Sequence, residues 1–561
     1  MRLVLVLLFV APLFAEEPSL ASRFPADPAV YVEGRELGAT IDAVAASPVG
    51  QAVRNHPGLQ EALRTPKAAQ LLFAQAMLKG ATGMDLQGLA RVLTAREFAA
   101  AVYGEKRAIA MARVDAQTAE TLFAGAEILS QQRRSEVLPA DAERAALWRL
   151  GEAFVCIEEG LLVVSTEEAL ATAVRNRTAP GVGEGTREAR GKVGADSDLF
   201  VYVDLRVFSE KLRAVGKPKD LGQAILLGAF AHQVPDAPWA AFGLRLAVEQ
   251  DEVRLTARGL VPVAGEPAEA VQASFGGTLD PLPLRLPDHT LAVVRMKRSL
   301  KAIWSYRDDL VHERAIPKLV EFETNFGNLT GGMSWVEQFL PSLREEDLVL
   351  LATRRVYEEG EPAPAVRYPQ GAVLFPIRKS DRFGLKLQIG FQTAIGIINA
   401  QQGMSGKAFF LTTEPYEGTM IQTARYLPPT EGEKEMAKAL PPRFNLEPSA
   451  AIVGDHFVLA STRGIVEELI DAQDGTTPVR SGVNSGFWLR PPEVLAILKE
   501  NREALVAQTM MKEGDDRPTA EKKIDFVLDI GGYVRELALT AEQSRASLGV
   551  VLEVVLGPAR E

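Results

Sequence analysis

The sequence contains a single cysteine, Cys156, among 561 residues. One cysteine cannot form an internal disulfide, so the fold must be stabilised by the burial of apolar side chains. Cys156 lies in the apolar run AFVCIEE. A thiol in such a run is usually a small buried hydrophobic group and not a nucleophile.

Histidine is also scarce. The five histidines are scattered through the chain, and no two have the H-E-x-x-H spacing of a zinc site. They are His56, His232, His289, His312 and His456. We therefore assign no catalytic, cofactor-binding or metal-binding residue from the sequence, and we expect no cofactor. The sequence favours a non-enzymatic protein but does not decide between this and an enzyme.

An excess of positive charge is absent. The chain has 62 Lys and Arg against 73 Asp and Glu, which gives a formal net charge of −11. This balance argues against a nucleic-acid partner, which usually binds a basic surface. Hydrophobic residues make up 47% of the chain and charged residues 24%, which is typical of globular domains with substantial cores.

The sequence has no apolar run long enough for a typical membrane span. At the N-terminus, Arg2 precedes the apolar run 3–10, which resumes as far as Ala15. This length is typical of a signal peptide and falls short of the roughly 20 residues that cross a bilayer. We predict a signal peptide over residues 1–21, cleaved near Ala15 or Ala21. The mature protein is then exported, periplasmic or extracellular, without a stable transmembrane segment.

A second apolar run, 383–402, carries only Lys386 as a charge but contains several Gln, Thr and Asn residues. These polar side chains argue against a membrane span. We expect a helix packed on a sheet. The alternative is that this run lines an apolar groove that binds a lipid or a partner helix.

The chain reads as two copies of one design. RFPADPAVYVEG near the start matches RLPDHTLAVVRM later, so that Val32 corresponds to Val294 at an offset of 262. Further along, Thr166 corresponds to Thr462, so the offset has grown to 296, a gain of 296 − 262 = 34 residues that falls in turn-rich inserts. We predict a first unit over 24–262, a connector over 263–283 and a second unit over 284–556.

The stretch AIVGDHFVLASTRGIVEELIDA, 451–472, contains Asp, His and Ser, the residue types of a hydrolytic site. The first half offers a comparison, because Glu159-Gly160 stands there in place of Asp455-His456. Both pairs lie between two apolar runs, which predicts a tight hairpin turn. Thr462 is predicted to cap the helix that follows. We interpret His456 as a turn residue without a catalytic role.

Two glycine-containing segments have a weak likeness to functional loops. PGVGEG at 180–185 lacks the strand and helix that flank a dinucleotide-binding loop. GMSGK at 403–407 lacks the spacing of a nucleophile elbow. We expect both to be loops at helix ends.

The motifs FPADPAVYVEG, EGLLVVSTEEAL and GDHFVLASTRGIVEEL resemble an exported bacterial family of unknown function. The second half departs from the first motif, with Val293 in place of the tyrosine. The resemblance covers the layout of most of the chain and implies no activity, catalytic residue or cofactor.

The predicted fold class is α+β. We expect a tandem duplication of a unit with a largely antiparallel, twisted sheet and helices mainly on one face. The expected function is non-enzymatic binding or scaffolding in the cell envelope, with an unknown envelope component or an apolar ligand as partner. Two alternatives remain open: a hydrolase with a site between the two halves, and a carrier of an apolar ligand.

Overall fold

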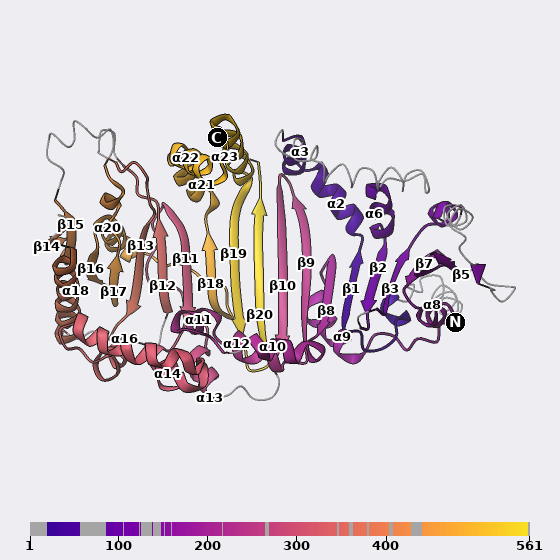
Figure 1. Ribbon diagram of the computed structural model, residues 1–561, viewed down its shortest axis with the longest axis horizontal. Coiled ribbons are helices and arrows are strands. Elements are labelled where there is room, and N and C mark those ends of the chain that lie inside the picture. Colours follow the sequence, from indigo (N-terminus) through magenta and orange to yellow (C-terminus); the bar gives the residue numbers. More distant parts are fainter. Residues whose placement is uncertain are drawn as a thin grey trace, which may run out of the picture. The chain divides into compact units, whose positions relative to one another are not determined.

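The structure is a computed structural model. It describes residues 19–558 except 57–85, 105, 123, 125–136, 139–146, 151, 159, 216, 264–268, 345–346, 358–362, 379–380, 403–407 and 428–439. The predicted signal peptide therefore lies almost entirely outside the described residues. The fold is α+β with a twisted, open antiparallel sheet, as the sequence predicts (Figure 1).

The chain forms two compact units. Unit 1 comprises residues 1–46, 61–207 and 239–246, and unit 2 comprises residues 47–60, 208–238 and 247–561. The predicted boundaries at 24–262 and 284–556 place 208–238 and 247–262 in the first half, whereas these segments belong to unit 2.

Unit 1 is built on antiparallel strands in the order β4-β5-β6-β7-β3-β2-β1-β8-β9. The strands are β1 (Val30–Arg35), β2 (Glu97–Val102), β3 (Ala108–Arg113), β4 (Val137–Leu138), β5 (Leu147–Leu150), β6 (Ala153–Glu158), β7 (Leu161–Ser165), β8 (Leu199–Asp204) and β9 (Trp239–Glu249), which belongs to unit 1 as far as Leu246. Its helices include α2 (Leu37–Ala46), α6 (Leu86–Thr94), α8 (Glu168–Arg175) and the shorter α9 (Glu184–Ala189). Tyr31 is fully buried against Phe24 and Phe200. The centre of its ring lies 5.3 Å from that of Phe24 and 6.4 Å from that of Phe200.

Unit 2 is built on antiparallel strands in the order β10-β20-β19-β18-β11-β12-β13-β17-β16-β15-β14. The strands are β10 (Glu252–Pro262), β11 (Thr290–Lys297), β12 (Asp347–Thr353), β13 (Gln370–Pro376), β14 (Phe409–Tyr416), β15 (Thr419–Tyr426), β16 (Ser449–Val453), β17 (His456–Ala460), β18 (Val483–Leu489), β19 (Val534–Gln543) and β20 (Ser547–Leu556). From β14 to β19 the order repeats that of β4 to β9, strand for strand.

Helices surround the unit 2 sheet at its ends and at one margin (Figure 1). At one end of the strands lie α10 (Ser209–Val215), α11 (Leu221–Leu227), α12 (Phe230–Gln233), α13 (Glu269–Phe275), α14 (Leu300–Ser305), α15 (Arg307–Leu310), α16 (Ile316–Leu329) and α17 (Leu340–Ser342). At the other end lie α21 (Pro491–Glu500), α22 (Arg502–Glu513) and α23 (Arg517–Gly531). Within the described residues, further helices of this unit are α3 (Pro48–Asn55), α18 (Asp381–Gln402) and α20 (Arg463–Asp471).

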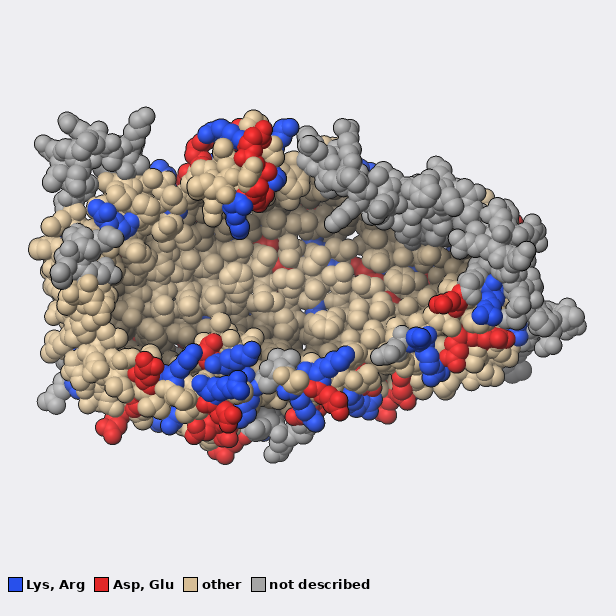
Figure 2. Space-filling view, in the orientation of Figure 1, with Lys and Arg blue, Asp and Glu red and all other residues tan. Residues whose placement is uncertain are grey.

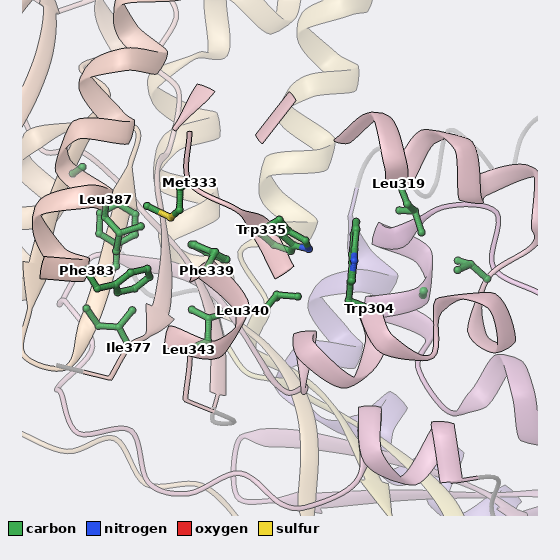
Figure 3. Packing of buried hydrophobic residues seen from close by; sticks show 14 of the residues in the cluster. Trp304, Leu319, Met333, Trp335, Phe339, Leu340, Leu343, Ile377, Phe383 and Leu387 are labelled. Carbon is green, nitrogen blue, oxygen red and sulfur yellow. The ribbon is translucent and has the colours of Figure 1, made fainter. Parts of the chain in front are cut away.

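Two hydrophobic clusters hold unit 2 together, one on each side of its sheet. On one side, Ile465 and Leu469 of α20 pack against Val458 of β17 and its neighbours. On the other side, Phe383 and Leu387 of α18 pack with Phe457 and with the π-helical turn Trp335–Phe339 (Figure 3). The rings of Trp335 and Phe339 stack at 4.8 Å. Both layers bury apolar area, which stabilises the sheet by about 25 cal/mol for each Å² removed from water.

The run 383–402 is part of α18, which packs against β14 and β16. Within the described residues, none of the helices combines the length and apolar character that crossing a bilayer requires.

The predicted connector, 263–283, contains a helix. Ala270, Val271 and Phe275 of α13 are buried in a cluster with Ile303 and Leu310. The sequence alone predicts no helix in this segment.

Candidate functional site

The hairpin turn predicted within 451–472 is present. β16 ends at Val453 and β17 begins at His456, and the two-residue turn Gly454-Asp455 has Gly454 at φ 57°. His456, however, is the first residue of β17 and is 5% exposed. Burial, with a smaller contribution from the Arg344 charge, lowers the pKa of His456 to about 4. The imidazole is therefore neutral near pH 7 and sits inside the fold, not in the turn.

The hydroxyls after β7 and β17 do not cap the helices. Thr462 is the N-cap residue of α20, but its hydroxyl bonds Gln370 on β13 and makes no cap hydrogen bond. Ser461 Oγ accepts a hydrogen bond from Gly371 N at 2.7 Å. In unit 1, Thr166 Oγ1 likewise accepts from Ala108 N at 2.9 Å. These hydroxyls form hydrogen bonds between the end of one strand and the neighbouring strand, which is a structural role. The prediction that Thr462 caps the helix with its side chain is therefore wrong.

Cys156 is buried, and burial raises the pKa of its thiol to about 11. A thiol with this pKa is almost entirely protonated near pH 7 and is a poor nucleophile. The other histidines have separate neighbours; His232 Nε2, for example, lies 3.0 Å from Leu310 O. No group of three or more His, Cys, Asp or Glu residues suited to a metal ion occurs in the described ranges.

Residues 180–183 lie between α8 and the short α9, and Glu184 and Gly185 are the first two residues of α9. A helix and not a strand precedes the segment, as predicted, but a helix also follows it, which was not expected from the sequence. The segment GMSGK, 403–407, lies outside the described residues.

The most extensive candidate site is one side of the unit 2 sheet. Cross-strand partners point to the same side of a sheet, so the register defines rows of side chains. One row, which we call the apolar row, crosses eight strands from β10 to β17 with no polar residue. Its members are Ala257, Leu552, Leu539, Phe487, Val294, Leu350, Val373 and Leu459.

The apolar row remains open to solvent. Leu539 is 42% exposed, Leu459 37% and Leu350 36%. A groove of about 490 Å³ runs over β11, β12, β13 and β17, lined by Val294, Val373 and their neighbours. The space-filling view shows a hollow whose floor over these strands is almost free of charge, with charged residues at its rims (Figure 2). We call this side of the unit 2 sheet the open side.

The opposite side of the sheet is either covered by a helix or lined by charged surface residues. Over β13, β16 and β17 it is covered by α20. Over β10, β19 and β20 it carries ion pairs, such as Arg258 with Glu542 at 3.6 Å. Polar residues therefore alternate to the side opposite the apolar row. On the side of the apolar row, α18 and the turn Trp335–Phe339 cover one end of β13 and β17 at Phe375 and Phe457, whereas Leu350, Leu459 and Leu539 stay exposed. An uncovered apolar surface of this kind marks a binding site.

Unit 1 carries a row of the same kind. Val32 of β1 is paired with Ala100 on one side and Val201 on the other, and both neighbours continue the row. Val164 is 36% exposed and Phe242 is 52% exposed. The row comprises Val155, Val164, Ala110, Ala100, Val32, Val201 and Phe242.

Comparisons with known proteins assign no family. No family model matches the chain, and no curated protein matches it. A solved structure described as "Structure of crystal form I of TP0453" aligns with 46% of this chain and 83% of its own, at 9% identity and a TM-score of 0.23. Similarity at this level supports neither a shared fold nor a shared function.

Sequence reasoning searched for polar clusters and missed the apolar rows. A signal was present, because DLVLLAT of β12 and QGAVLFP of β13 are nearly continuous apolar runs without alternation. Such runs indicate strands that are apolar on both sides. The sequence alone could not show that only one of these sides is covered.

Proposed function

We propose that this protein is a non-enzymatic binding protein that holds the acyl chains of a lipid on the open side of unit 2. The observation that carries the proposal is the apolar row, which crosses eight strands without a polar side chain and stays exposed at Leu350, Leu459 and Leu539. Of the functions considered from the sequence, this is the carrier of an apolar ligand. The site differs from the expected one, because the ligand lies on an open face and not between sheet and helices.

The dimensions of the row fit an acyl chain. Eight strands have seven spacings of about 4.8 Å, so the row is about 34 Å long. A bilayer core is about 30 Å thick, so the chains of one leaflet reach about 15 Å. The row is long enough for an extended chain to lie fully on it.

The chemistry of the row favours hydrocarbon over a protein partner. Protein interfaces carry about one hydrogen bond for each 100–200 Å² of buried area. The row offers only methyl, methylene and aromatic groups. An acyl chain has no hydrogen bonds to satisfy, so such a surface binds it without leaving a polar group unpaired.

The cell envelope is the proposed location. Arg2 and the apolar run 3–10 support export, and envelope lipids supply the proposed ligand there. Membership of the exported family that the sequence motifs resemble belongs to the same proposal. The hydrolase with a site between the halves stays a prediction without a specific observation in its favour.

We also propose that the two halves arose by duplication. The shared strand order of β4–β9 and β14–β19 supports this, and so does the position of Val32 and Val294 at the same point of the two apolar rows. If both rows bind lipid, Val32→Asp and Val294→Asp should each remove part of the lipid bound per chain, as measured by mass spectrometry of extracted lipid. A loss confined to one variant would contradict a shared role.

The main test is binding of a neutral fluorescent diacylglycerol to delipidated full-length protein. The variant Leu350→Asp with Leu539→Asp places two charges in the row, and burying an unpaired charge under a hydrocarbon chain is costly. We expect the affinity to fall by about tenfold or more, since about 1.4 kcal/mol corresponds to each factor of ten.

The matched control is Leu385→Asp with Leu427→Asp. These leucines are 58% and 70% exposed but lie off the row, on α18 and after β15. The control should bind as the parent does, and melting curves should show that both double variants fold. No binding by the parent, or an equal loss in both variants, would refute the proposed function.

A further inference from the structure

A basic pocket opens on the open side of unit 2, at the ends of β12 and β13. Leu348 and Phe375 contribute to its lining, and each lies two residues from a member of the apolar row, Leu350 and Val373 respectively. Residues two apart on a strand point to the same side and are about 7 Å apart. The pocket therefore continues the apolar surface at one edge.

The remaining lining of the pocket comes from helical segments and strand ends. Leu340 and Leu343 form an apolar wall. The cationic residues of the lining are Arg298, Lys301, Arg344 and Arg378. No Asp or Glu lines the pocket in the described part of the chain. Its volume is about 90 Å³, a size suited to a small anionic group.

The backbone around the pocket holds two of these cations in place. Arg344 N donates to Pro376 O at 3.0 Å, and Arg378 N donates to Ser342 O at 2.8 Å. Arg344 also forms an ion pair with Asp455 at 3.1 Å. Lys301 and Arg378 are both exposed, and neither forms an ion pair within the described ranges. Their charges are thus available to a ligand.

Arg298 adds a buried positive charge that no carboxylate neutralises among the described residues. Its guanidinium donates to Ile225 O at 2.8 Å and to Asn484 Oδ1 at 2.9 Å, and lies 5.5 Å from the centre of the Phe275 ring. Burial lowers the pKa of Arg298 to about 10, so the group remains charged near pH 7. A charge held by neutral acceptors adds to the positive potential of the pocket that it lines.

We propose that this pocket binds the phosphate of an anionic lipid whose acyl chains lie on the apolar row. The inference rests on the proposed function and adds the ligand class. Charge complementarity carries it, because four cations gather at the edge of a surface that is otherwise free of charge. Arginine and lysine donate strong, charge-assisted hydrogen bonds to phosphate oxygens. The arrangement matches an amphiphile with one anionic end and one apolar end.

The test compares fluorescent phosphatidylglycerol with fluorescent diacylglycerol on the delipidated full-length protein. The parent should bind the anionic lipid about tenfold more tightly, as two or more charge-assisted contacts would give. Lys301→Gln with Arg378→Gln should remove most of this preference. Arg314→Gln with Lys318→Gln removes the same charge from exposed positions outside the pocket lining and should keep the preference. Melting curves of both variants check the fold.

Four outcomes would overturn the inference. The parent binding both lipids equally would show that the head group is not recognised, while the proposed function would stand. An equal effect of both double variants would show a general charge effect and no pocket. Displacement of the lipid by millimolar inorganic phosphate would identify free phosphate as the ligand of the pocket. Absence of binding to either lipid would refute the proposed function, and the inference with it.

Discussion

At the scale of single residues, His456 illustrates what the sequence predicts well and what it does not. The comparison of the two halves correctly predicts the hairpin turn before β17. It does not predict burial of the imidazole, because the side of β17 that α20 covers is decided by the register with β13 and β16. His456 pairs with Pro376 and Val453, and Arg344, Asp455 and Arg295 are the charged groups around it.

The burial of His456 predicts a pH dependence of stability. The pKa of a histidine is about 6.5 in an unfolded chain and about 4 in this fold. Between these values the unfolded state binds more protons, so stability is fully present above pH 6.5 and is lost as the pH falls towards 4. The loss attributable to this group is about 3 kcal/mol at the lower end. Urea unfolding of the parent and of His456→Gln between pH 4 and 7.5 measures it.

As the pH falls from 6.5 to 4, the unfolding free energy of the parent should decrease more than that of His456→Gln. Curves that stay parallel from pH 7.5 to 4 would show that His456 does not carry the effect. A catalytic His456 is tested separately, because an esterase or peptidase activity of the parent that His456→Gln abolishes would contradict the structural role.

At the scale of elements, α13 shows what a local sequence pattern does not reveal. Its apolar positions, Ala270, Val271 and Phe275, share one face, but alanine and short length give little periodic signal. The helix is stabilised by what it packs on, including Ile303 and Leu310, which are distant in sequence. Tertiary burial of this kind is invisible to a local pattern. Long strands with strong β-propensity, such as β19 and β20, were predictable because their signal is local.

Phe275→Ala should therefore destabilise the protein by about 3–5 kcal/mol, because it removes a fully buried ring from a packed cluster. Gln272→Ala, at an exposed position of the same helix, is the matched control and should cost less than about 0.5 kcal/mol. Denaturant unfolding measures both. In limited proteolysis of the native parent, residues 269–275 should resist cleavage. Early cutting inside α13 would contradict its packing in the core.

At the scale of the whole molecule, the sequence predicted the α+β fold. That prediction rests on local strand and helix patterns. The candidate site could not be predicted in the same way, because it depends on which apolar strand residues the rest of the described chain leaves uncovered. Residues such as Leu350 and Leu539 look like ordinary core residues in the sequence, and only the three-dimensional arrangement leaves them exposed.

An open apolar surface on a folded protein predicts dye binding without denaturant. Delipidated native protein should enhance the fluorescence of anilinonaphthalene sulfonate, and added neutral diacylglycerol should reverse the enhancement by occupying the row. Leu350→Asp with Leu539→Asp should reduce the enhancement, while Leu385→Asp with Leu427→Asp should leave most of it. Dye fluorescence that appears only together with loss of the folded state would mean that the rows are covered in solution.

The single thiol, Cys156, makes the opening rate of its strand measurable by chemical labelling. Cys156 lies in β6 of unit 1, is 1% exposed and has a pKa of about 11, so a thiol reagent reaches it only when that strand opens. Unit 2 contains no cysteine and does not react with the reagent. The rate of labelling therefore reports the opening of unit 1 alone. Labelling followed over hours at rising denaturant would separate the local opening of β6 from unfolding of the whole chain. The scarcity of cysteine thus makes the opening rate of one half directly measurable in the unmodified protein.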